Sequence, residues 1–435
     1  LVLPVDDGSE GRALVRQAQR DVAQGSSSAR AVSGALLVDG DDLSLRRDDP
    51  ATPYPQDGIH FGTAGTYHLG MRMAESIHWE KVTRGDLTGD PALDPAPVFW
   101  NPPSRYADSV RTFQGIPGIE RAPGGRLWAT WYTGGTGEGP DNCVVLVSST
   151  DDGANWSPLS LVIDPPGTIR AFDPCLWLDP DGRLWLFYAQ SRSWYDGRAG
   201  VWAMVTSNPD AAAPNWSPPR RLSHGVMMNK PIVLTTGAWM LPVALWNVRE
   251  GDYTDLDPLR RANVVRSHDH GQSWHLAGGA AIPEKRNCDE HMVVEAQDGV
   301  LHMFIRTAYG IGESRSTDHG VTWPAATPSA IAHTTSRFFI RRLRSGNWLL
   351  VKHGAIDERG GRADLKAFIS SDEGKTWQGG LMLDERGGVS YPDGIEAPDG
   401  TLRIIYDYSR TGAMEILMAA FTEADARAGE DISGR

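Results

Sequence analysis

The residues best suited to chemistry in this chain are a tyrosine, acidic residues and an arginine that lie at the ends of short apolar strands. Glu290 precedes the stretch Met-Val-Val-Glu, and an Asp-Gly turn then leads into a strand that ends at Arg306. Ser390-Tyr391 precedes a similar pair of strands, the second of which ends at Tyr406-Asp407. A carboxylate moves protons, a guanidinium binds carboxylates through paired N–H bonds, and a tyrosine attacks carbon once a base takes its proton. Together these residue types can move protons, form a covalent bond and bind a carboxylate.

Two further carboxylates, Glu138 and Asp141, lie in a glycine-rich stretch that reads Thr-Gly-Gly-Thr-Gly-Glu-Gly-Pro-Asp from Thr133. A glycine-rich backbone suits a loop that closes over a bound substrate. Either carboxylate is a candidate acid, and the sequence does not choose between them. A solvated loop carboxylate is the plainer interpretation of each.

Histidine offers a different chemistry, because some enzymes cleave uronic-acid linkages by β-elimination with His and Tyr as base and acid. Five histidines are spread along the chain as candidates: His60, His68, His78, His291 and His353. None has the spacing of a zinc-binding pair, so we expect no metal site and no cofactor. His291 lies beside Glu290, although strand alternation predicts that the two side chains point in opposite directions.

Composition narrows the classes of partner. The formal net charge is −13 and the pI is about 5.4, which argues against binding of nucleic acid. No run of about 18 apolar residues indicates a membrane span, and three widely spaced cysteines do not form a disulfide framework. We therefore expect a glycan or another small ligand as the partner. The compartment stays open, with a secreted or periplasmic location slightly favoured, since a trimmed leader would leave no trace.

A glycine turn followed by a short apolar strand recurs along the chain and sets the architecture. The six copies begin at Gly125, Gly182, Gly237, Gly299, Gly346 and Gly400. Their separation of roughly 50–60 residues matches a four-stranded propeller blade with generous loops. The sequence therefore predicts an all-β fold, a six-bladed β-propeller of four-stranded antiparallel blades.

A second motif, Ser-x-Asp-x-Gly-x-x-Trp, runs in phase with the first. Clean copies begin at Ser149, Ser267, Ser316 and Ser370, and a worn copy lies between Ser207 and Trp216. The Asp accepts backbone N–H bonds, the Gly takes a positive φ, and the Trp packs between blades. We expect these turns to stabilise the scaffold and to take no part in the chemistry.

The repeats also suggest the domain organisation. Residues 1–104 form an N-terminal extension in which residues 11–24 could be a short helix and residues 58–79 a strand that closes the ring. Residues 105–425 form the propeller, and residues 426–435 form a C-terminal tail.

With its Asp-boxes and the Glu290 and Tyr391 segments, the chain resembles the sialidase (neuraminidase) superfamily of BNR-repeat β-propeller glycosidases. The resemblance implies that Tyr391 is the nucleophile, that Glu290 is its base, and that Glu138 or Asp141 is the acid. It also implies that Arg306 and Arg362 bind the carboxylate of the substrate. A neutral tyrosine suits such a substrate, since a carboxylate nucleophile would repel it.

The chain departs from this family at one motif. Sialidases carry an Arg in a Tyr/Phe-Arg-Ile-Pro sequence at the start of the first blade, and this chain has Gln114-Gly115-Ile-Pro. Gln114 is then a candidate contact to the substrate, Arg111 is close in sequence, and Arg337 could compensate. Asp407 corresponds to the acidic residue that orients the missing Arg. His291 completes the candidate binding residues.

Three functions follow as hypotheses. The first is a retaining exo-glycosidase that hydrolyses a terminal acidic sugar, with sialic acid as the family default. The second is a polysaccharide lyase, or a glycosidase for another terminal sugar such as rhamnose linked to glucuronate or an arabinan end. The third is a propeller that binds carbohydrate without turnover. A hydrolase releases a reducing sugar, a lyase yields an unsaturated uronate, and a binding module yields neither.

Overall fold

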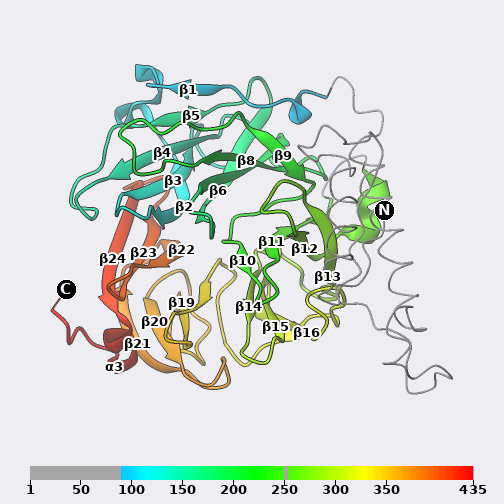
Figure 1. The fold of residues 1–435 in the computed structure, drawn as a ribbon, viewed down its shortest axis with the longest axis vertical. Coiled ribbons are helices and arrows are strands. Elements are labelled where there is room, and N and C mark those ends of the chain that lie inside the picture. Colours follow the sequence, from blue (N-terminus) through cyan, green and yellow to red (C-terminus); the bar gives the residue numbers. More distant parts are fainter. Residues whose placement is uncertain (1–89, 249–252, 435) are drawn as a thin grey trace, which may run out of the picture.

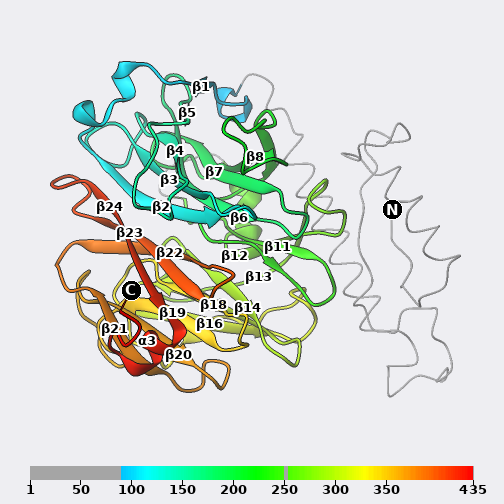
Figure 2. The ribbon, with the colours of Figure 1, turned by 60° about the vertical axis from the view of Figure 1, so that its left-hand side comes forward.

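The computed structural model describes residues 90–248 and 253–434, and this part of the chain is a six-bladed β-propeller. Six antiparallel sheets surround a common axis in Figures 1 and 2, with the first sheet lying beside the last. The predicted fold class is confirmed. The five short helical segments are η2 (Pro91–Leu93), η3 (Ser104–Tyr106), η4 (Asp108–Val110), η5 (Thr254–Leu259) and α3 (Glu423–Ala428).

The strands follow the chain blade by blade. The first sheet consists of β1 (Val98–Trp100), β2 (Gln114–Arg121), β3 (Leu127–Thr133), β4 (Cys143–Ser149) and β5 (Leu161–Ile163). The second sheet consists of β6 (Ile169–Leu178), β7 (Leu184–Arg192), β8 (Gly200–Thr206) and β9 (Arg220–Ser223). The third sheet consists of β10 (Ile232–Val233), β11 (Trp239–Ala244), β12 (Ala262–Ser267) and β13 (His275–Ala280).

The second half of the ring repeats this arrangement. The fourth sheet consists of β14 (Met292–Glu295), β15 (Leu301–Thr307), β16 (Gly310–Ser316) and β17 (Thr327–Pro328). The fifth consists of β18 (Phe339–Arg342), β19 (Trp348–His353), β20 (Leu365–Ser370) and β21 (Gln378–Asp384). The sixth consists of β22 (Val389–Glu396), β23 (Thr401–Tyr408) and β24 (Glu415–Thr422).

The strand nearest the axis, which is β2 in the first blade and the first in chain order in the other blades, is counted as the first strand of its blade. Strand β2 contacts both β22 and β6, and β18 contacts both β14 and β22. The core lies between neighbouring sheets, where wide aromatic side chains fill the space. Trp177 of the second sheet, for example, packs edge-on against Trp239 of the third, with ring centroids 5.0 Å apart.

The six glycines predicted as turns all close the same hairpin, between the first two strands of each blade. Each has a positive φ, from 76° at Gly182 to 110° at Gly125, a region that glycine enters without steric cost. Each glycine N–H donates to the carbonyl of the residue three positions earlier, as from Gly400 to Ala397 at 2.9 Å. The spacing of these glycines therefore predicts the number of blades because one hairpin of this kind occurs in each.

The Ser-x-Asp-x-Gly-x-x-Trp copies form turns at the end of the third strand of their blades. In the fourth blade, Oγ of Ser316 accepts from the N–H of Gly320 at 2.9 Å, and Oδ1 of Asp318 accepts from the N–H groups of Val321 and Thr322 at 3.1 and 2.9 Å. Because strands alternate in direction, this end of the blade is also the end that carries the glycine hairpins.

Asp318→Ala is expected to lower the free energy of unfolding by about 1–2 kcal/mol, because it leaves these turn N–H groups without their acceptor. The Tm should fall by a few degrees, and kcat should stay unchanged, since the turn lies at the opposite end of the strands from the candidate site below. Thermal unfolding and kinetics on one preparation would check both. A folded variant with strongly reduced kcat would contradict the scaffold interpretation.

The first and last blades differ from the predicted four strands. The first has five, because β1 pairs with β5 at its outer edge before the chain enters β2. The last has three, because Thr422 ends β24 and begins α3 with a capping box in which its side chain and that of Asp425 bond each other's backbone N–H groups. Helix α3 then packs against β21 and β20 of the fifth blade and adds no fourth strand.

The predicted domain boundaries, at residues 105 and 426, stay predictions. Strand β1 (Val98–Trp100) belongs to the first sheet although it precedes residue 105, and α3 begins before residue 426. The predicted helix at 11–24 and closing strand at 58–79 lie outside the described residues, as do His60, His68 and His78.

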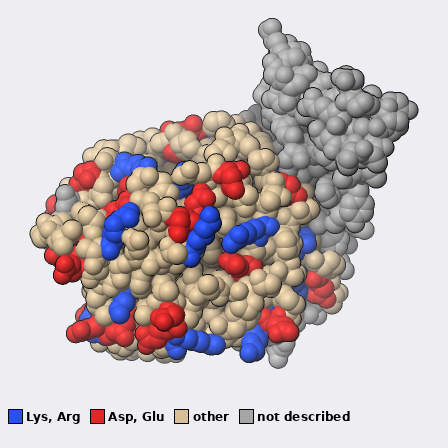
Figure 3. Space-filling view, turned by 90° about the horizontal axis from the view of Figure 1, so that it is seen from below, with Lys and Arg blue, Asp and Glu red and all other residues tan. Residues whose placement is uncertain are grey.

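The surface of the described part carries charges of both signs. On the face drawn in Figure 3, Lys and Arg are interspersed with Asp and Glu and do not gather into one basic surface. In residues 90–248 and 253–434 no helix is both long and apolar enough to cross a membrane. The cysteines Cys143, Cys175 and Cys288 are free thiols.

Candidate active site

The candidate residues converge at the end of the strands opposite the glycine hairpins. Tyr391 lies at the start of β22, Glu290 just before β14, and Arg306 near the end of β15. First strands begin, and second strands end, at this end of the ring. The antiparallel order of the strands within each blade therefore brings together residues that are about 100 positions apart in sequence.

Tyr391, Glu290 and Arg306 form one hydrogen-bonded group. The Tyr391 hydroxyl donates to Oε1 of Glu290 at 2.7 Å and accepts from Nη1 of Arg306 at 2.6 Å. Nη1 of Arg306 also donates to the same Glu290 oxygen. All three side chains are at most 10% exposed. The phenol proton therefore points at a carboxylate that can accept it.

Burial and charge set the protonation of this group. Burial, and then the negative charge of Glu290, raise the pKa of Tyr391, so its hydroxyl is protonated at neutral pH. Burial alone would lower the pKa of Arg306, but the negative charge of Glu290 raises it. The resting site is thus a neutral phenol beside the ion pair of Arg306 and Glu290.

The backbone at Tyr391 has a strained conformation that directs the side chain toward Glu290. Its φ is +56°, and the pairing of β22 with β23 shifts register between Ser390 and Asp393. A β-bulge of this kind bends the strand and redirects one side chain. A non-glycine residue at positive φ costs roughly 1–3 kcal/mol and tends to occur at functional sites.

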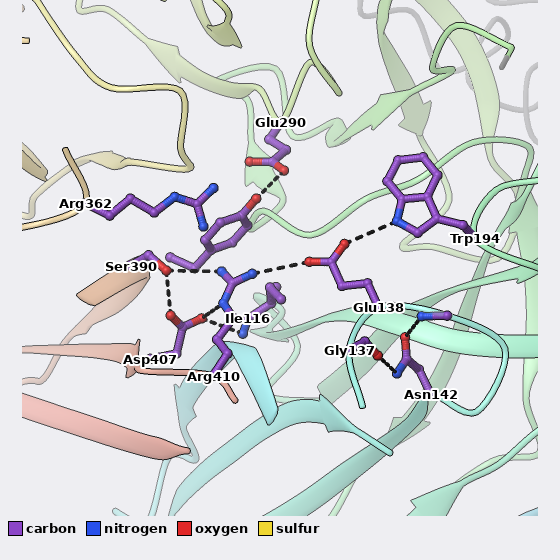
Figure 4. Close-up of polar contacts among 12 residues, drawn as sticks. Ile116, Gly137, Glu138, Asn142, Trp194, Glu290, Arg362, Ser390, Asp407 and Arg410 are labelled. Carbon is purple, nitrogen blue, oxygen red and sulfur yellow. Dashed lines mark hydrogen bonds and ion pairs between the residues drawn. The ribbon is translucent and has the colours of Figure 1, made fainter. Parts of the chain in front are cut away.

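Two further guanidiniums, those of Arg362 and Arg410, lie against the Tyr391 ring, and both arginines are labelled in Figure 4. The Cζ atom of Arg410 lies 4.2 Å from the ring centroid and that of Arg362 lies 5.3 Å from it, whereas Arg306 is 6.0 Å away. Arg362 comes from the loop between β19 and β20, and Arg410 from the loop after β23. Among the described residues, Arg362 has no carboxylate partner, which leaves its charge available for a ligand. Arg410 was not among the residues predicted from the sequence.

Asp407 orients this corner of the site. Its Oδ1 accepts from the Ser390 hydroxyl at 2.6 Å, and its Oδ2 accepts from the Ile116 N–H at 2.8 Å and from Nε of Arg410 at 2.9 Å. The carboxylate is fully buried, and each oxygen has a partner. Its role in holding an arginine therefore matches the role that the resemblance implies, although the arginine is not the one expected.

The structure separates the two candidate acids. Oε1 of Glu138 lies 3.3 Å from Nη1 of Arg410, and Oε2 accepts from Nε1 of Trp194 at 3.4 Å (Figure 4). The charge of Asp141 acts instead on Asp164, whose carboxylate accepts from the Tyr106 hydroxyl at 2.5 Å on the outer side of the first sheet. Glu138 is the carboxylate of this loop that faces the site.

A third carboxylate, Asp173 of β6, was missed from the sequence. It is 4% exposed, and its pKa is raised to about 8, first by burial and also by the charges of Glu290 and Glu138, against the opposing effect of Arg170. Its φ is +49°, and β6 shifts register there as β22 does at Tyr391. Asp173 is thus a protonated carboxyl group in the wall of the site at neutral pH.

Asp173→Asn is expected to make stability less dependent on pH. The folded-state pKa of about 8 lies above the unfolded value of about 3.9, so the wild type loses stability as pH rises from about 4 to 8. Asn keeps the shape, tolerates positive φ and does not ionise. At pH 8 the variant should be more stable by at least about 1.4 kcal/mol, the equivalent of one pKa unit, with little difference at pH 4. Denaturant unfolding at the two pH values would show it, and equal pH dependence would refute it.

Three of the predicted binding residues lie away from the tyrosine hydroxyl. Gln114 accepts from Nε1 of Trp131 at 3.0 Å and lines a cavity of about 820 Å³ between the first and sixth sheets. Arg337 is fully buried, with Nη2 3.4 Å from Oδ1 of Asp393. The ring nitrogens of His291 lie 2.8 and 2.7 Å from the carbonyl oxygens of Asp289 and Asn263.

The two candidate histidines of the described part, His291 and His353, are buried and have ring nitrogens within hydrogen-bond distance of backbone carbonyl oxygens. Burial lowers the pKa of His291 to about 4. Burial also lowers the pKa of His353 to about 4, although a hydrogen bond with the backbone opposes this shift. Nε2 of His353 lies 2.9 Å from the carbonyl oxygen of Val389. Within residues 90–248 and 253–434 no group of three His, Cys, Asp or Glu side chains is arranged to hold a metal ion.

Similar structures share the propeller. The chain is 20% identical to the Hadza microbial sialidase Hz136, with a TM-score of 0.58 over 72% of this chain and 66% of that one. A mutant of NanB sialidase from Streptococcus pneumoniae is 14% identical, with a TM-score of 0.56 over 74% and 69% of the two chains. A leech intramolecular trans-sialidase is 14% identical, with a TM-score of 0.56 over 77% and 71%. The chain thus spans about two thirds of the length of these proteins, and the likeness establishes the fold.

Sequence comparison gives the family. No curated protein matches the chain in sequence. The family model described as a BNR repeat-like domain matches residues 125–404, which is more than half of the chain and includes all six turn glycines. This match shows that the chain belongs to the BNR repeat-like domain family, and its sialidase neighbours share the six-bladed propeller fold.

Proposed function

We propose that this protein is a retaining exo-glycosidase that hydrolyses a terminal acidic sugar of the sialic acid class. The observation that carries the proposal is the Tyr391 hydroxyl, which donates to Glu290 at 2.7 Å while three arginines surround the ring. A phenol held against a buried carboxylate is an activated nucleophile. Surrounding cations would place an anionic sugar next to it.

The reaction proceeds through two displacements. Glu290 takes the phenol proton as the Tyr391 oxygen bonds to the anomeric carbon, and the glycosidic oxygen leaves with a proton from Glu138. Water then gives a proton to Glu138 and attacks the same carbon, and the tyrosine regains its proton from Glu290. Two inversions retain the configuration at the anomeric carbon.

The residues of the site explain why tyrosine suits an acidic sugar. A carboxylate nucleophile would repel a substrate carboxylate in a poorly solvated site, whereas a neutral phenol does not. Among the similar structures, the leech trans-sialidase carries 2,7-anhydro-Neu5Ac and a Trypanosoma rangeli sialidase carries the inhibitor DANA. These neighbours support sialic acid as the first substrate class to test.

The test is product analysis with sialyllactose and an aryl sialoside as substrates. Release of free sialic acid, formed first as the α-anomer in a proton NMR time course, would support retaining hydrolysis. An unsaturated uronate from glucuronate-containing glycans would support a lyase instead, and binding without product would support a carbohydrate-binding propeller. Absence of turnover on acidic-sugar glycosides would reject the proposal.

A further inference from the structure

Position 115 lacks a side chain at the point where β2 enters the site. A Cβ atom there would lie 2.8 Å from Cδ of Arg410 and 2.9 Å from both its Cγ and Nε. Real Cβ contacts are not that short, and the backbone of Gly115 is not at positive φ. Glycine is therefore required at this position by the neighbouring side chain, whose stem fills the space that a residue at 115 would use.

Arg410 is fixed in this space by β2, β22 and β23 together. Its carbonyl accepts from the N–H of Gln114 at 3.0 Å, which ties the loop after β23 to β2. Its Nε donates to Asp407 at 2.9 Å, and its Nη2 donates to the Ser390 hydroxyl at 3.2 Å. Asp407 also accepts from Ile116, the residue next to Gly115. One carboxylate thus aligns the glycine strand and the arginine.

The other arginines considered for this position do not reach it. Arg111 donates to the Tyr106 carbonyl at 3.0 and 3.2 Å and to the side chain of Gln114 at 3.2 Å, on the outer side of the sheet. Arg337 donates to the Pro117 carbonyl at 3.3 Å and pairs with Asp393. Arg410 alone of these three has its guanidinium against the Tyr391 ring, at 4.2 Å.

We infer that Arg410 replaces the arginine absent at position 115 and, with Arg306 and Arg362, completes an anion site that takes the carboxylate of the sugar. The inference deepens the proposed function and rests on it, because it assigns the ligand contact of the same site. The cation has moved from β2 to the loop after β23, while Asp407 keeps its place as the anchor.

The test removes the guanidinium at position 410 and introduces one at position 115. Arg410→Ala should weaken binding of DANA, measured by calorimetry, at least about 30-fold, since it removes hydrogen bonds to a charged group. Binding of the methyl ester of DANA should change less than about 3-fold, because the ester lacks the charge. The double variant Gly115→Arg/Arg410→Ala should bind DANA at least about 10-fold more tightly than Arg410→Ala. Gly115→Arg alone should bind poorly, because two side chains then compete for one space.

Arg386→Ala is the matched control. Arg386 belongs to the turn before β22, where it pairs with Asp384 at 2.6 Å and stacks on Tyr408, so its loss should leave DANA binding unchanged. The binding readout separates the two proposals: a wild type that binds DANA without hydrolysing sialosides would reject the proposed function and still test Arg410. The inference is overturned if Arg410→Ala binds DANA like the wild type, if a folded double variant shows no recovery, or if the wild type does not bind DANA.

Discussion

Tyr391→Phe is expected to lower kcat on acidic-sugar glycosides by at least about three orders of magnitude. The change removes the attacking oxygen and keeps the ring against the arginines, so the fold should survive. Glu290→Gln should cost a similar factor, because the phenol oxygen, held 2.7 Å from Glu290, then has no base for its proton. Since the two residues act as one unit, the double variant should be little worse than the worse single variant.

Tyr408→Phe provides the control for this series. Tyr408 also lies in the sixth blade beneath an arginine, Arg386 at 3.9 Å from its ring, so the same atom is removed outside the site. Its kcat should equal that of the wild type. Near-full activity of folded Tyr391→Phe would exclude the tyrosine mechanism, and multiplicative losses in the double variant would show that the two residues act independently.

Much of the fold could be predicted because short-range rules fix its repeating parts. A turn that needs positive φ demands glycine, so Gly125 and its five counterparts mark one hairpin in each blade. The number of strands in the first and last blades depends on other interactions. Pairing of β1 with β5, and the capping box at Thr422 that begins α3, follow from contacts that no repeat in the sequence encodes.

In the candidate site, too, some residues could be predicted from the sequence and others depend on long-range contacts. Tyr391 and Glu290 could be proposed together because their segments resemble those of sialidases, and the two side chains lie in hydrogen-bond contact. Arg410 could not, because its importance depends on an empty position in β2, at Gly115, which is distant in sequence. An absent side chain gives no signal of which residue will fill its space.

Asp173 did have a signal, which lies in the phase of the repeats. Tyr391 precedes its turn glycine, Gly400, by the same interval that separates Asp173 from Gly182 and Glu290 from Gly299. Residues in one phase of a propeller repeat occupy equivalent places around the axis. Counting back from each turn glycine would therefore have placed all three side chains at one level of the ring.

Glu138→Gln should separate the two halves of the reaction. On sialyllactose, whose leaving oxygen needs a proton, the first chemical step should slow by about 10²–10⁴-fold. On an aryl sialoside with a good leaving group that step should be nearly unchanged, since little protonation is needed. The second step still needs a base to activate water, so the sugar should accumulate on Tyr391. A burst of released phenol, and a mass increase of one sugar residue on the intact protein, would show it.

Variants of Asp141 and Asp173 test whether Glu138 is the residue that donates the proton to the leaving oxygen. Asp141→Asn changes the same loop, but this side chain acts electrostatically on Asp164 and not on the site, so both substrates should react at the wild-type rate. Asp173→Asn removes a carboxyl that is protonated at neutral pH because its pKa is about 8, and a protonated group is itself a possible donor. Suppose that Asp173→Asn, and not Glu138→Gln, loses activity on sialyllactose and keeps activity on the aryl sialoside. Asp173 of β6 is then the residue that supplies the proton. The loop carboxylate would then serve only to hold Arg410, which it already meets at 3.3 Å.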